Sequence, residues 1–99
     1  MLKVGGIYTT SNYIDIIVKI TDDKIHSYYI NDVFTFTNKI VEKKLKTFLR
    51  HDISHFSYVN KKLYINQYTG YLGQISDESL ELLLNKLNEL QKEKEFWKE

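Results

Sequence analysis

Two histidines and an aspartate lie close together in the segment "HDISH", His51 to His55. On a helix, both imidazoles would project from one face and could bind a metal ion, with Asp52 beside them. The residues that follow, Phe56 and Tyr58, instead favour a passage from a loop into a strand, and no third ligand is evident. We therefore expect no metal site here, and interpret the segment as a polar helix exit.

His26 is the other candidate for chemistry, because it stands beside the hydroxyl groups of Ser27 and Tyr28 and could act as a general base. A histidine on the solvent side of a hairpin is far commoner, and we expect that arrangement. The sequence contains no glycine-rich phosphate loop, nucleophile elbow or zinc-protease motif. It also lacks cysteine, which excludes disulfides and thiolate chemistry. We expect no catalytic residues and no cofactor.

A basic stripe offers a binding function instead. Lys39, Lys43, Lys46 and Arg50 recur at helical spacing, with Lys44 beside them. Such a stripe could follow the phosphates of a nucleic acid or meet an acidic protein surface. A lysine-rich helix face is also often just a solvated face, and a net charge of +1 is low for an independent nucleic-acid binder.

Tyrosines supply the second binding signal. The chain has eight of them, and Tyr64, Tyr68 and Tyr71 cluster near its end. Tyrosine gives a large amphipathic contact area and is enriched at protein interfaces. We expect these tyrosines and the basic stripe to bind a partner, which is a larger protein or, alternatively, a nucleic acid.

Composition indicates one ordinary globular domain. The 99 residues are 42% apolar and 27% charged, and no proline or flexible linker divides them. The chain has neither a signal peptide nor an apolar run of roughly 20 residues that could span a membrane, so we expect a cytoplasmic protein.

The element pattern predicts an α+β fold. We expect strands over about 4–37, a basic helix over about 38–50, strands over about 55–72 and a helix over about 76–97. In "YIDIIVKIT" every second residue is aliphatic, which predicts a strand with Ile16 and Val18 facing inward and Lys19 outward. "KIHSYYI" returns as a hairpin after Asp22-Asp23, and "VFTFT" continues the meander. "HFSYVN" and "KLYIN" read as two further strands with a turn at Asn60-Lys61.

The last helix has the clearest start signal, because Ser76 can cap it and acidic residues follow. Leucines from Leu80 to Leu87 form an apolar stripe that must pack on the sheet. The far part of the helix, with Leu90, Phe96 and Trp97, extends beyond a domain of this size. It is therefore a predicted interface for a homodimer or a partner protein.

The run "SYVNKKLYINQYTGYLGQISDESLELLLNKL" resembles the carboxy-terminal part of PemK/MazF-type toxin barrels. Ser57-Tyr58-Val59 corresponds to a strand of that family, and Gly73 to Asp77 corresponds to the junction that opens its last helix. "KVGGIY" is similar to the family's opening segment. The resemblance implies a small SH3-like antiparallel β-barrel, or a bent sheet, closed by a helix.

The resemblance does not extend to the family's catalytic residues. That family cleaves RNA with an arginine beside a proline near its first strand. This chain has no proline, and its only arginine, Arg50, lies in the predicted basic helix. We therefore expect a non-enzymatic protein that binds a larger partner, typical of phage or mobile-element inhibitors of host or defence enzymes. A PemK/MazF-like endoribonuclease of toxin-antitoxin type and a nucleic-acid-binding accessory protein are the alternatives.

Overall fold

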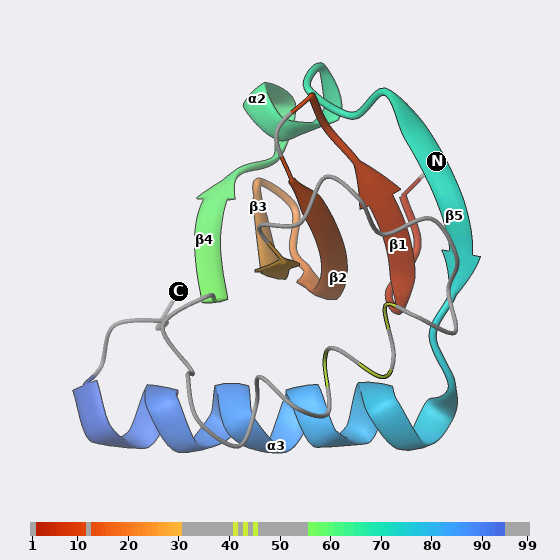
Figure 1. Ribbon diagram of the computed structural model, residues 1–99. Coiled ribbons are helices and arrows are strands. Elements are labelled where there is room, and N and C mark those ends of the chain that lie inside the picture. The colour runs from red at the N-terminus through yellow and green to blue at the C-terminus, as the bar shows by residue number, and fades with distance from the viewer. Residues whose placement is uncertain are drawn as a thin grey trace.

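The computed structural model describes residues 2–11, 13–30, 41, 43, 45 and 56–94, with the backbone alone for 58, 64 and 90–94. It shows an α+β protein whose described strands form one antiparallel sheet (Figure 1). The elements are β1 (Gly6–Thr9), β2 (Ile14–Ile20), β3 (Lys24–Ile30), β4 (Phe56–Asn60), α2 (Lys61–Ile65), β5 (Gly70–Gln74) and α3 (Asp77–Lys94). The expected strand of residues 33–37 lies outside the described residues.

The strand order is β4-β3-β2-β1-β5, so the last strand returns to pair with the first. β2 and β3 form the predicted hairpin, and their turn is closed by backbone and side-chain hydrogen bonds between Thr21 and Lys24. β5 pairs with β1 in a register that shifts between Ile7 and Tyr8. β4 and β5 lie at opposite ends of this order, so the described strands form an open sheet rather than a closed barrel.

The larger hydrophobic core lies between the sheet and α3, which runs along one face (Figure 1). Ile16 and Val18 of β2 pack there with Leu83 and Leu87 of α3, as their spacing predicts. Val41 and Leu45 are helical, as expected, and belong to the same cluster. The described part of the predicted basic helix therefore packs on the α3 side of the core.

A second, smaller cluster lies on the opposite face of the sheet. Ile17 of β2 and Ile25 of β3 are fully buried there, beside Tyr8 of β1. The sequence pattern predicted a mixed face, whereas β2 is buried on both faces from Ile14 to Val18. Because both faces of this central strand are covered, alternation alone understates its burial.

Two expectations about local structure are wrong. The segment "KLYIN" is not a strand: the chain enters the short helix α2 at Lys61, where the Asn60 side chain accepts a hydrogen bond from the Lys62 N–H at 3.0 Å and caps it. His26 does not face solvent either. It is fully buried, because it lies on the same face of β3 as Tyr28 and Ile30, which pack in the larger core.

The helix α3 begins as predicted. Ser76 Oγ accepts a hydrogen bond from the Ser79 N–H at 3.2 Å, and Asp77 and Glu78 occupy the first turn. No helix within the described residues is both long enough and apolar enough to cross a membrane.

Candidate functional site

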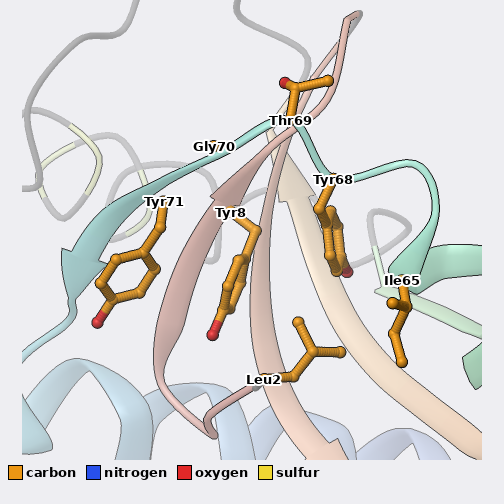
Figure 2. A pocket seen from close by; sticks show the side chains of 7 residues that line it. All are labelled: Leu2, Tyr8, Ile65, Tyr68, Thr69, Gly70 and Tyr71. Carbon is orange, nitrogen blue, oxygen red and sulfur yellow. The ribbon is translucent and has the colours of Figure 1, made fainter.

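A shallow pocket of about 400 Å³ opens on the face of the sheet opposite α3 (Figure 2). Its lining contains no charged residue. Tyr8 comes from β1, Tyr71 from β5, and Tyr68 from the connection between α2 and β5. The other lining residues are Leu2, Ile65, Thr69 and Gly70.

Tyr8 is the centre of the pocket wall. Its ring stacks on Tyr68 with centroids 5.1 Å apart and planes 25° apart, and it meets Tyr71 at 5.1 Å and 45°. Its hydroxyl oxygen accepts a hydrogen bond from the Lys3 N–H at 2.9 Å. Three tyrosines from separate segments thus form one row of rings, a rigid aromatic surface.

Gly6 makes room for this row, and Gly70 makes room for Thr9 on the neighbouring strand. A Cβ on Gly6 would lie 2.6 Å from the Tyr8 ring and 2.9 Å from the Lys3 carbonyl oxygen, and one on Gly70 would lie 2.8 Å from Thr9 Oγ1. Any side chain at Gly6 would displace Tyr8. Gly5 has a φ of 82°, a left-handed conformation that glycine adopts readily.

A carboxylic acid lies buried beside the row of rings. Asp15 stands directly opposite Tyr8 in the β1–β2 register and is completely buried. Burial raises its pKa from 3.8 to about 7, an effect that hydrogen bonding to the Tyr68 and Ser27 hydroxyls only partly opposes. The Tyr68 hydroxyl donates to Asp15 Oδ2 at 2.9 Å. This hydrogen bond attaches Tyr68, which forms one wall of the pocket, to the central strand β2.

The rim of the pocket exposes apolar side chains. Tyr71 is 51% exposed and Ile65 is 48% exposed. Large apolar side chains gathered around a hollow, rather than scattered singly, are typical of interaction sites. Ile65 and Tyr71 border the pocket from its two sides (Figure 2).

Only some of the predicted binding residues lie within the described part of the chain. The structure brings Tyr68 and Tyr71 together, and Tyr64 lies in α2, which also contributes Ile65. Lys43 is exposed, but its neighbours Val41 and Leu45 pack on the other side of the sheet. Four members of the basic stripe lie outside the described residues: Lys39, Lys44, Lys46 and Arg50. The same holds for His51, Asp52, His55, Phe96 and Trp97. For Leu90 only the backbone in α3 is described.

Sequence reasoning missed Tyr8, Leu2 and Asp15. A usable signal exists for Tyr8, because in a strand it must face away from its core neighbour Ile7. Across the described part of the chain, no three His, Asp or Glu side chains come together as a metal site would require.

Comparisons of the chain with protein-family models, with curated proteins and with solved structures find no match.

Proposed function

We propose that this protein is a non-enzymatic binding protein that engages a larger protein through the pocket face. The observation that carries this proposal is the row of Tyr8, Tyr68 and Tyr71 beside the exposed Ile65. Tyrosines held in place by stacking lose little conformational entropy on binding, and they are enriched among the residues that dominate interface energetics. The uncharged lining suits an apolar anchor of a partner better than a phosphate backbone.

The partner we propose is an enzyme of a host cell or of its defences, which the chain inhibits by covering part of its surface. Support comes from small size and a tyrosine-rich face, and the step from binding to inhibition is analogy with phage accessory proteins. For the complete fold we propose the SH3-like bent sheet rather than the closed barrel. The pairing of the last strand, β5, with the first, β1, supports it.

Affinity capture tests the binding function. The tagged protein is incubated with a lysate of its source cells, with and without nuclease, beside the variants Tyr71→Glu and Asn85→Glu. Asn85 is exposed on α3, away from the pocket, and serves as the matched control. We expect the same protein to be retained by the wild type and by Asn85→Glu. Retention by Tyr71→Glu should fall about thirtyfold, which corresponds to about 2 kcal/mol at an interface hot spot.

Two outcomes would contradict the proposal. A partner that disappears after nuclease treatment is bridged by RNA, which favours the nucleic-acid alternative. Equal capture by Tyr71→Glu and the wild type would show that the pocket face is not the interface. Incubation with a long structured RNA tests the ribonuclease alternative, because specific cleavage that is lost in Arg50→Ala would make the protein an enzyme.

A further inference from the structure

The strand β5 lies at one end of the described sheet (Figure 1). Within the described residues it pairs with β1 alone. A strand in this position presents a second row of backbone N–H and C=O groups along its outer edge, and such a row can template pairing with another extended chain.

This edge carries neither of two common features with which soluble proteins discourage such pairing, although β5 is short and its register with β1 shifts at Leu72. Monomeric proteins commonly place charged side chains or proline on exposed edge strands. Here no charged residue and no proline occurs anywhere between Lys62 and Asp77. Gly70 and Gly73 also leave the backbone bare on either side of Tyr71 and Leu72, and glycine in a strand often marks a site where another backbone approaches closely.

Apolar side chains border the edge on both faces of the sheet. Tyr71 stands on the pocket face, and about half of its surface is exposed. Leu72 is half-buried and packs towards the α3 side, where Leu80 is also half-buried against the same core cluster. An added strand would therefore cover aromatic surface on one face and aliphatic surface on the other, beyond its backbone hydrogen bonds.

The acidic residues that follow β5 indicate which end of an added strand would carry a basic residue. Asp77 and Glu81 are both exposed and lie one turn apart at the start of α3, immediately after the strand. In an antiparallel arrangement, which the whole described sheet follows, the amino-terminal end of an added strand would lie beside them. A basic residue at that end would be electrostatically complementary.

We propose that an extended segment of a partner protein adds to β5 as a further antiparallel strand. The segment is about the length of β5, five residues. It is apolar on both faces and is preceded by Lys or Arg. Backbone pairing supplies the general affinity, and contacts with Tyr71 and Leu72 supply selectivity. This inference rests on the proposed protein-binding function and names the kind of segment that the partner offers.

A second copy of this chain fits the edge less well. Antiparallel pairing of two β5 strands would set Asp77 and Glu81 of one copy beside the neutral segment that precedes β5 in the other, and parallel pairing would set acid against acid. Glycine at two of the five β5 positions also gives a second copy little side-chain surface to offer.

Panning a display library of short random peptides against the intact protein tests the proposal, followed by amide hydrogen exchange of the protein with the enriched peptides. We expect enriched sequences with a basic residue before an apolar run. Exchange should slow at least tenfold at those amides of Gly70–Gln74 that face away from β1, and should stay unchanged in β4. Two versions of the best peptide, N-methylated at alternate residues, provide the matched control. One should lose binding because its methyl groups face β5, and the other should keep it.

Each other outcome overturns strand addition. Each also shows whether the proposed protein-binding function stands. Peptides that bind without slowing exchange in β5 would dock by side chains alone, so protein binding would stand and strand addition would fall. Slowed exchange in β5 that depends on protein concentration, without peptide, would identify a second copy as the occupant. If no peptide is enriched, strand addition fails, while capture of a partner protein still decides the proposed function independently.

Discussion

The hydroxyl group of Tyr68 donates a 2.9 Å hydrogen bond to Oδ2 of Asp15, a carboxyl group that is completely buried in the central strand β2. The two residues are 53 positions apart in the sequence. Tyr68 also stacks on Tyr8 and lines the pocket, so one side chain joins the buried acid to the proposed binding face. The ionisation of Asp15 and the position of the pocket wall are therefore coupled.

The first prediction concerns the pH dependence of stability. Burial raises the pKa of Asp15 from its ordinary value of 3.8 to about 7 in the folded protein, so the folded state binds this proton more tightly than the unfolded state does. The free energy of unfolding should therefore fall as pH rises from about 4 to about 7, and then level off. A shift of about three pH units corresponds to about 4 kcal/mol from this one group. Chemical denaturation across this pH range measures it.

The variant Asp15→Asn is the control for this prediction. An amide keeps the size of the side chain and still accepts the Tyr68 hydrogen bond, but it carries no charge. The variant should show a flatter pH profile and should equal or exceed the wild type in stability at pH 8. An identical slope in both proteins would mean that other groups cause the pH dependence.

The second prediction tests the hydrogen bond itself. Tyr68→Phe keeps the ring and its stacking on Tyr8 but leaves the buried Asp15 Oδ2 without this donor. We expect a loss of about 1 to 3 kcal/mol in stability at neutral pH. The pKa of Asp15 should also rise further, because the hydrogen bond lowers it. Tyr71→Phe is the matched control, since its hydroxyl makes only an exposed 3.3 Å contact with Gln74 and should change stability by less than about 0.5 kcal/mol. Equal losses in the two variants would contradict the prediction.

The elements that sequence reasoning located best are those whose signals are local. The β2–β3 hairpin follows from alternation and from a polar turn, and the start of α3 follows from Ser76 and the acidic residues after it. The helix α2 was missed because Leu63, Tyr64 and Ile65 are residues that also suit a strand. Its helical form depends on the Asn60 cap and on a backbone hydrogen bond from Lys61 to Asp23, a residue far away in the sequence.

Only part of the candidate site could be predicted, because its other residues join it through contacts between distant parts of the sequence. Tyr68 and Tyr71 could be selected as aromatic residues in a polar segment. Their neighbour Tyr8 joins them only through the pairing of β5 with β1, which no local pattern predicts. Asp15 looked like an ordinary polar residue of an alternating strand. Its burial requires Tyr68 to fold over the sheet from the other end of the chain.

The third prediction addresses the two buried faces of β2. Val18 packs towards α3 and Ile17 packs in the smaller cluster, and both are essentially inaccessible. Val18→Asp and Ile17→Asp should each unfold the domain, because an unpaired charge is buried in either case. Lys19→Asp, at a partly exposed position, should cost far less. Thermal unfolding followed by circular dichroism compares the three variants, and a stable Ile17→Asp protein would show that the smaller cluster does not hold the fold together.

The fourth prediction separates the two halves of α3. Its completely buried leucines, Leu83 and Leu87, lie in the first part of the helix. Truncation after Glu89 should therefore leave a folded domain, while removing Leu90, Phe96 and Trp97, the predicted interface residues. If these residues mediate association, the truncated chain should be monomeric by light scattering at concentrations where the full chain forms dimers, and its unfolding midpoint should change little. Leu87→Ala in the full chain is the control, because a cavity beside the sheet should cost about 2 to 5 kcal/mol without removing the predicted interface. A truncated chain that unfolds would place the end of the helix in the core, and association would then have to be sought at β5 and the pocket face.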